Sequence, residues 1–224
     1  LAQAATAVAL LAMAGTPLPL WSLPIVLIAI TAVINFFNFM DGLDGLVALC
    51  ALVLMAAAGQ PILAGALAGF LLWNWSPARV FMGDVGSTWL GAVFAGLVLQ
   101  QPTPLNAAAL LVLAFPLLGD ALVCVLRRLR AGQPVFQAHR LHLFQRLQRG
   151  GWSHRRVAAV YGGATALLAL ARLAQPFQGW PLVLLLTLGA ELALAWRLEQ
   201  RAAPFDPGLR TGRDGPDSKG GSSS

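Results

Sequence analysis

The stretch Asn35-Phe36-Phe37-Asn38-Phe39-Met40-Asp41-Gly42-Leu43-Asp44-Gly45-Leu46 follows about fifteen apolar residues and decides how this chain is interpreted. Its four polar side chains recur at every third position, so neighbouring pairs share a helix face although all four do not. Placing a carboxylate near a bilayer costs free energy, so a membrane protein that has carboxylates there usually needs them for its function. Gly42 and Gly45 predict a break in the helix where backbone amides can approach a ligand. The alternative is a polar helix end with a tight turn, which needs only one or two of these residues.

The composition predicts an all-α, polytopic integral membrane protein. Of the 224 residues, 58% are hydrophobic and 11% are charged, whereas soluble domains carry about 25% charged residues. Lipid-exposed spans have to be helices or closed barrels, and long apolar runs without strict alternation predict helices. We expect about seven or eight transmembrane helices with cytoplasmic active-site loops. Their approximate ranges are 1–15, 21–38, 45–59, 61–75, 87–100, 105–126, 157–173 and 180–197.

The basic residues predict the orientation in the membrane. Residues 127–156 contain eight arginines and no acidic residue, so the positive-inside rule places them in the cytoplasm. Alternation of the spans then puts residues 39–45 and 76–86 on the same side. We therefore expect membrane lipid, and no nucleic acid, as the partner of these arginines. Residues 1–200 are expected to form the transmembrane domain, and residues 201–224 a disordered cytoplasmic tail.

A second polar cluster lies between two predicted spans, at residues 74–87. Two glycines flank Asp84, and Ser87 is expected to cap the next helix, whose N-terminal amides would favour an anion. A plain helix-loop-helix with Asp84 in a turn is the alternative. Farther along, Asp120 lies at the cytoplasmic end of the span 105–126. Its presence there is explained equally well by a functional role and by an ion pair with Arg127 or Arg128.

The most basic segment has a helical pattern over residues 137–149. His139, His142, Arg146 and Arg149 repeat at three- and four-residue spacing, which would form one cationic stripe on a helix. An amphipathic helix on anionic lipid is one interpretation, and a set of donors for phosphate oxygens is the other. His154 and its two neighbouring arginines come next, where membrane anchoring explains the arginines.

The three clusters together are typical of phosphoryl transfer at a membrane surface. Carboxylates without a Cys/His quartet suit Mg²⁺ or Mn²⁺ rather than structural zinc. Mg²⁺ uses one or two carboxylates plus phosphate oxygens, and arginines or histidines can neutralise the remaining phosphate charge. A soluble phosphate donor would arrive from the cytoplasm, and a lipid acceptor from within the bilayer.

These motifs resemble the polyprenyl-phosphate N-acetylhexosamine-1-phosphate transferase superfamily, glycosyltransferase family 4. That superfamily includes the peptidoglycan translocase and the enzymes that initiate O-antigen synthesis. The resemblance covers roughly residues 20–165, with the motifs at 35–46, 81–87 and 138–145 in the same order. The third motif is similar to the O-antigen aminosugar-phosphate branch, because Phe144 and Gln145 stand where other members have further histidines.

The resemblance implies a multi-pass enzyme of the bacterial inner (plasma) membrane with a cytoplasmic active site. It implies transfer of an N-acetylhexosamine-1-phosphate from a UDP-sugar to undecaprenyl (polyprenyl) phosphate, with release of UMP, to initiate a lipid-linked envelope glycan such as O-antigen. It also implies Mg²⁺ as the cofactor, with Mn²⁺ as a substitute, and is compatible with a homodimer. The implied roles are catalysis for Asp41, Asp44 and His142, substrate binding for Asn35, Asn38, Asn74, Phe81, His139 and Arg140, and metal ligation for Asp84.

One feature of the family is missing. Members carry two adjacent aspartates on an earlier cytoplasmic loop, and this sequence has no Asp-Asp pair. Because Leu1 begins within the pattern, we expect the N-terminal spans and this pair to be absent, and the chain alone to be inactive.

Four other functions compete with this interpretation. A translocase-type phospho-N-acetylmuramoyl-pentapeptide transferase and a non-catalytic relative both agree with the motifs. A CDP-alcohol phosphatidyltransferase would need an arginine in the motif that begins at Asp44-Gly45, and Leu49 stands there. A transporter with broken helices would need acidic residues deep within its spans. In this sequence, only Glu191 lies deep within a predicted span.

Overall fold

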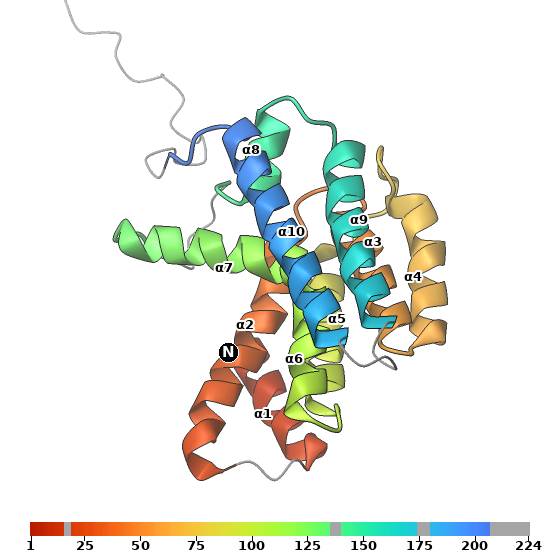
Figure 1. Ribbon diagram of the computed structural model, residues 1–224, viewed down its shortest axis with the longest axis vertical. Helices are drawn as coiled ribbons and strands as arrows, with labels where there is room; N and C mark the ends of the chain where they lie inside the picture. Colours follow the sequence, from red (N-terminus) through yellow and green to blue (C-terminus); the bar gives the residue numbers. More distant parts are fainter. Residues whose placement is uncertain (16–18, 135–139, 174–179, 207–224) are drawn as a thin grey trace, which may run out of the picture.

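The computed structural model describes residues 1–15, 19–134, 140–173 and 180–206. Every regular element in this part of the chain is helical, which confirms the all-α prediction (Figure 1). The helices are α1 (Ala2–Ala14), the 3-10 helix η1 (Leu20–Ser22), α2 (Leu23–Met40), α3 (Leu46–Ala57), α4 (Pro61–Asn74), α5 (Gly83–Leu99), α6 (Pro104–Leu113), α7 (Phe115–Arg130), α8 (Leu143–Arg149), α9 (His154–Leu173) and α10 (Trp180–Arg201).

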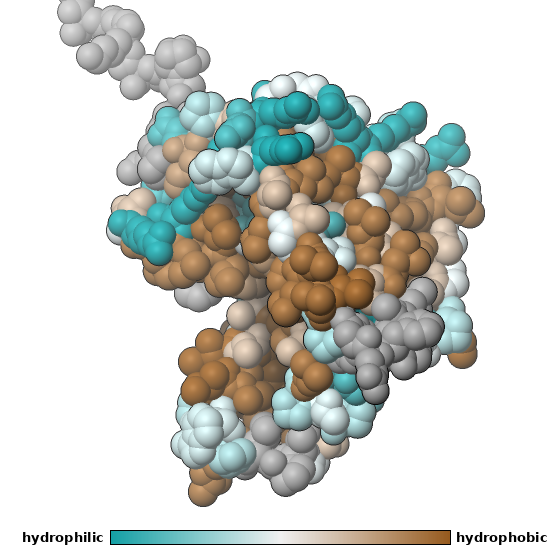
Figure 2. All heavy atoms as spheres, viewed as in Figure 1, coloured by the Kyte–Doolittle hydropathy of each residue, from teal (hydrophilic) through white to brown (hydrophobic). Residues whose placement is uncertain are grey.

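The hydropathy of these helices agrees with a polytopic membrane protein. The segments Leu20–Met40 and Pro181–Arg201 are each long and apolar enough to cross a bilayer, and α6 with α7 makes a third crossing if the pair is one broken span. Four shorter apolar helices, α1, α3, α4 and α5, join them among the described residues. Figure 2 shows hydrophobic side chains over much of the surface, while hydrophilic ones gather at the end that carries α8.

The predicted continuous span over 105–126 is wrong. α6 ends at Leu113 and α7 begins at Phe115, with an angle of 81° between the two helices. Pro116 explains the break, because proline has no amide hydrogen and its ring clashes with the preceding turn, so it is tolerated only in the first turn of a helix. The bend turns α7 across the bundle (Figure 1).

The core lies between α2 and α5 and around α3, which packs against both α4 and α9. The rings of Phe37 in α2 and Phe94 in α5 are fully buried, with their centroids 5.5 Å apart. Within a bilayer such contacts stabilise helix pairs through close packing rather than through exclusion of water. This packing brings the C-terminal end of α2 next to the N-terminal ends of α3, α5 and α9.

The residues after α10 return to α8. The Ala203 amide donates to the carbonyl of Arg146 at 3.1 Å, and the Ala203 carbonyl accepts from Arg146 Nε at 2.6 Å. The expected disordered tail stays a prediction, since residues 207–224 lie outside the described part of the chain.

Candidate functional site

The turn between α2 and α3 carries the first two carboxylates. The Asp41 amide closes α2 by donating to the Asn38 carbonyl at 3.2 Å. Gly45 has a φ of +74°, and a Cβ atom there would lie 2.9 Å from the Trp75 ring. Both the backbone conformation and the space therefore require glycine. The predicted break in the helix is confirmed.

Asn38 joins the first motif to the second. Its Nδ2 lies 3.1 Å from Asp84 Oδ1 and 3.1 Å from Ser87 Oγ. Asp84 is exposed in the first turn of α5, where the free backbone amides of a helix favour a negative charge. The predicted cap at Ser87 is wrong, because α5 begins at Gly83 and the buried Ser87 hydroxyl donates to the Gly83 carbonyl within the helix.

Asn74 holds the backbone of both motifs. It is buried, its Oδ1 accepts from the Gly45 amide at 3.1 Å, and its Nδ2 donates to the Val80 carbonyl at 2.9 Å. Asp44 makes a parallel link, since its Oδ2 accepts from the Ala78 amide at 3.3 Å. The two motifs thus form one unit, in which Asn74 and Asp44 shape the loops.

Two basic residues from the start of α9 complete this end of the bundle. His154 Nδ1 lies 3.2 Å from Asp44 Oδ2, and Arg155 Nε donates to the carbonyl of Ser76. The sequence interpretation assigned the arginine to membrane anchoring and gave the histidine no role. One prediction from the sequence could have pointed to His154 and Arg155. It is the expectation that residues 127–156 lie on the same side of the membrane as both acidic motifs.

The electrostatics of the turn favour a cation near Asp41. Burial, together with the negative charge of Asp84, raises the pKa of the Asp41 carboxyl from 3.8 to about 6. Two carboxylates that disfavour each other's charge are stabilised when a proton or a metal ion neutralises one of them.

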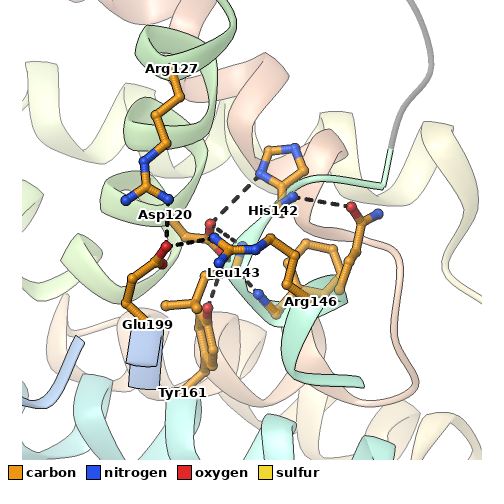
Figure 3. A network of polar contacts seen from close by, with 9 residues as sticks. Asp120, Arg127, His142, Leu143, Arg146, Tyr161 and Glu199 are labelled. Carbon is orange, nitrogen blue, oxygen red and sulfur yellow. Dashed lines mark hydrogen bonds and ion pairs between the residues drawn. The ribbon is translucent and has the colours of Figure 1, made fainter. Parts of the chain in front are cut away.

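A second polar network centres on Asp120 of α7 (Figure 3). Its carboxylate accepts from the Leu143 amide at 2.7 Å, from the Phe144 amide at 3.1 Å and from the Tyr161 hydroxyl at 2.8 Å. The alternative of an ion pair between Asp120 and a neighbouring arginine is wrong. Arg127 pairs instead with Glu199 at 2.6 Å, and Arg128 donates to the carbonyl of Pro134.

The predicted helix over 137–149 is shorter, and its cationic stripe is wrong. α8 begins at Leu143, and His142 is its N-cap residue, whose amide donates to Gln145 Oε1 at 3.3 Å. His142 and Arg146 are only 2% and 3% exposed, because the face they share turns inward, toward α7 and α10. Burial, with the positive charge of Arg128, lowers the pKa of His142 to about 4. Its imidazole is therefore neutral at physiological pH.

The remaining predicted site residues are placed as follows. Asn35 donates to the Thr31 carbonyl of its own helix at 2.7 Å, and it has no hydrogen bond to the other motifs within the described part of the chain. Phe81 is 73% exposed beside the second motif, Arg140 is exposed, and His139 lies outside the described residues. His142 does approach the first motif, since its ring centroid is 6.3 Å from that of Phe39. Substrate contacts of these residues stay predictions.

The donor set fits Mg²⁺ or Mn²⁺ only together with a substrate. Within the described residues, no group of three or more His, Cys, Asp or Glu side chains is arranged to hold a metal ion. Asp41 and Asp84, with the Asn38 amide nearby, supply oxygen ligands of the kind that Mg²⁺ prefers. Mg²⁺ commonly takes one or two carboxylates and completes its shell with water and phosphate oxygens.

Comparison with known proteins finds relatives for the part of the chain that holds the two acidic motifs. Residues 2–101 match the model of glycosyl transferase family 4. A decaprenyl-phosphate N-acetylglucosaminephosphotransferase of Mycobacterium tuberculosis is 37% identical over 114 residues, which are 44% of this chain and 28% of that protein. Phospho-N-acetylmuramoyl-pentapeptide-transferases of Corynebacterium kroppenstedtii and Mycolicibacterium smegmatis are 31% and 34% identical over 58% and 52% of this chain.

The alignments cover only part of this chain and only part of each relative. The alignments cover 34% of the Corynebacterium protein and 31% of the Mycolicibacterium protein, so the chain spans about a third of the length of the curated relatives it matches. The family match ends before α6, and the Asp120 network lies beyond it.

Proposed function

We propose, from the membership of this chain in the polyprenyl-phosphate hexosamine-1-phosphate transferase superfamily, that the protein transfers a sugar-1-phosphate from a nucleotide sugar to a polyprenyl phosphate. The observation that carries the proposal is the hydrogen bond between Asn38 and Asp84. It brings the carboxylates of two motifs to one end of a bundle of apolar helices, where a soluble phosphate donor and a lipid acceptor can meet.

The residues have distinct roles in this reaction. Asp84 and Asp41 would hold Mg²⁺, which neutralises the charge of the diphosphate when it is bound. Asp44 is oriented by His154 and by the Ala78 amide, and it forms the wall of the site beside Asp41. His142 is neutral, so it offers a hydrogen-bond donor to phosphate oxygens without adding a charge.

The bonds change at the second phosphorus of the nucleotide sugar. In the direct route, an oxygen of the lipid phosphate forms a new P–O bond to this sugar-bearing phosphorus, and the bond to the bridging oxygen of the nucleotide breaks. In the two-step route, an aspartate carboxylate first takes the sugar-1-phosphate as the same bond breaks, and the lipid phosphate then displaces the carboxylate. UMP leaves with that oxygen and its electron pair when the donor is a UDP-sugar. The products are the lipid-linked sugar diphosphate and UMP, so atoms and charges balance without a further reactant.

The finer assignment follows the third motif. We propose a UDP-N-acetylhexosamine as the donor and undecaprenyl phosphate as the acceptor, at the cytoplasmic side of the bacterial inner membrane. Phe144 and Gln145, in place of further histidines, favour the O-antigen aminosugar branch. The pentapeptide-transferase relatives support a second candidate, in which the donor carries N-acetylmuramoyl-pentapeptide.

The test uses the product of the complete gene in proteoliposomes with polyprenyl phosphate. UMP release is measured with UDP-N-acetylglucosamine, related UDP-N-acetylhexosamines and UDP-N-acetylmuramoyl-pentapeptide, with and without Mg²⁺. We expect one of the simple UDP-N-acetylhexosamines to react, and Asp84→Asn to reduce the rate by about 100-fold or more, since loss of a residue that merely supports a metal ligand already costs roughly 10- to 100-fold. Asp206→Asn is the matched control, because it removes an exposed carboxylate outside the site.

Each outcome has a clear meaning. Full activity of Asp84→Asn would remove this residue from the metal site. Reaction with the pentapeptide donor alone would favour the translocase-type function. No UMP release with any donor, in a protein that is folded and inserted, would favour a non-catalytic relative or a transporter.

A further inference from the structure

The N-terminal end of α8 is held by a carboxylate on another helix. Asp120 lies in α7, and it accepts hydrogen bonds from the first two amides of α8 and from Tyr161 in α9 (Figure 3). We propose that Asp120 is a positioning residue which, together with Tyr161, holds the start of α8 against the turn between Asp41 and Asp44. Asp120 thereby sets the place of His142 in the site. This inference rests on the proposed function in taking His142 as a phosphate-binding group.

The helix needs this support because it is short. α8 has seven residues, and an isolated helix of that length is not stable in water. Its first amides have no partner within the helix. A carboxylate satisfies two of them with charge-assisted hydrogen bonds, and its charge is favourable at the positive end of the helix dipole.

The same end of α8 touches the site. A Cβ atom on Gly42 would lie 3.1 Å from two carbons of the Phe144 ring and 3.5 Å from Gln145 Nε2. Phe144 therefore lies directly against the backbone between Asp41 and Asp44. The His142 ring stacks on the Phe144 ring with centroids 5.6 Å apart, so a shift of Phe144 also shifts His142.

The middle of α8 is fixed separately. Arg146 pairs with Glu199 of α10 at 2.7 Å and donates to the Ala203 carbonyl. Since these contacts do not involve Asp120, loss of the Asp120 contacts would release the start of α8 without releasing the whole helix. Asp120 therefore positions His142, whereas the contacts of Arg146 keep α8 attached to the rest of the protein.

The direct test is the titration of His142 by NMR in the histidine-labelled chain in detergent micelles. Its signal is assigned by its absence in His142→Gln. In Asp120→Asn and in the milder Tyr161→Phe, we expect the His142 ring to become exposed and its pKa to rise by at least one unit from about 4 toward the ordinary 6.5. Loss of a negative charge at Asp120 cannot raise the pKa of His142, so a rise reports displacement of the ring toward solvent rather than direct electrostatics.

Thr165→Val is the matched control. The Thr165 hydroxyl is buried and donates to the Tyr161 carbonyl, so this variant deletes a hydroxyl on the same helix without touching Asp120. We expect its His142 pKa to equal that of the wild type. An unchanged or lowered His142 pKa in folded Asp120→Asn and Tyr161→Phe would overturn the inference.

An activity measurement on the complete protein adds a second test. Asp120→Asn should reduce kcat/KM for the nucleotide sugar at least tenfold, and Thr165→Val should reduce it less than twofold. Wild-type rates in Asp120→Asn would also overturn the inference. If the wild type itself is inactive, the proposed function fails, and the titration of His142 still decides whether Asp120 positions it.

Discussion

His154 Nδ1 lies 3.2 Å from Asp44 Oδ2, which ties the start of α9 to the turn between α2 and α3. The two residues are far apart in the sequence, and no motif joins them. The same Asp44 carboxylate accepts a hydrogen bond from the Ala78 amide, so three segments of the chain meet there. This carboxylate orders the site as well as contributing its charge.

The contact between His154 and Asp44 should matter more for activity than for stability. His154→Ala leaves Asp44 with one partner and should reduce kcat/KM of the complete protein about tenfold, as loss of an orienting contact does. The pair is partly exposed, so the free energy of unfolding should change by less than about 1 kcal/mol. Arg156→Gln is the control, because Arg156 stacks on Trp152 and not on the site. Equal rates for His154→Ala and the control would contradict this role.

An added carboxylate at Asn38 should make stability depend on Mg²⁺. Asn38→Asp replaces the amide that donates to Asp84 by a third negative charge next to Asp41 and Asp84. Without divalent cations we expect the free energy of unfolding to fall by roughly 1–2 kcal/mol. Millimolar Mg²⁺ should restore it, because the metal ion binds the extra carboxylate. Asn38→Ala loses the hydrogen bond alone and should show no rescue, as measured by thermal unfolding in detergent.

Neutral, buried His142 should give the protein a defined pH dependence. Its pKa is about 4 in the folded state and about 6.5 in the unfolded state. Between these values the unfolded chain binds more protons, so stability falls as the pH is lowered from 6.5 to 4, by up to about 3 kcal/mol.

The raised pKa of Asp41 acts in the opposite direction between pH 3.8 and about 6, so the two contributions have to be separated. The difference in unfolding free energy between the wild type and His142→Gln, measured from pH 7 to pH 4.5, isolates the histidine. The wild type should lose stability faster than the variant as the pH falls. Parallel curves would show that His142 keeps an ordinary pKa.

Two glycines with the same backbone conformation separate strain from packing. Gly45 and Gly59 have φ values of +74° and +73°, but a Cβ atom meets Trp75 at 2.9 Å in the first and nothing within 4 Å in the second. Gly59→Ala should cost about 1–2 kcal/mol, the penalty of a left-handed residue. Gly45→Ala should lower the free energy of unfolding by about 1–3 kcal/mol more than Gly59→Ala does, because the added methyl group overpacks against Trp75. Chemical denaturation of both variants measures the difference, and equal costs would mean that Trp75 moves away freely.

The sequence predicted the apolar helices well because their signal is local. Long runs without charge fit a helix in a bilayer whatever they pack against. The break at Pro116 was missed even though proline is a local signal, because the apolar run continues on both sides of it. The spacing of His142 and Arg146 predicted a shared cationic face but not its burial, since periodicity defines a face of a helix but not what covers that face.

By itself, the sequence determined the class of the protein, the break after α2 and the residue types proposed for a phosphate and metal site, because each depends on neighbours along the chain. Only the tertiary structure decided that Asn38 reaches Asp84, that His154 holds Asp44 and that Asp120 caps α8. These contacts join segments whose relative positions follow from the packing of α2, α5, α7 and α9. A hydrogen bond forms only where that packing brings donor and acceptor within about 3 Å, and no local pattern in a sequence contains that distance.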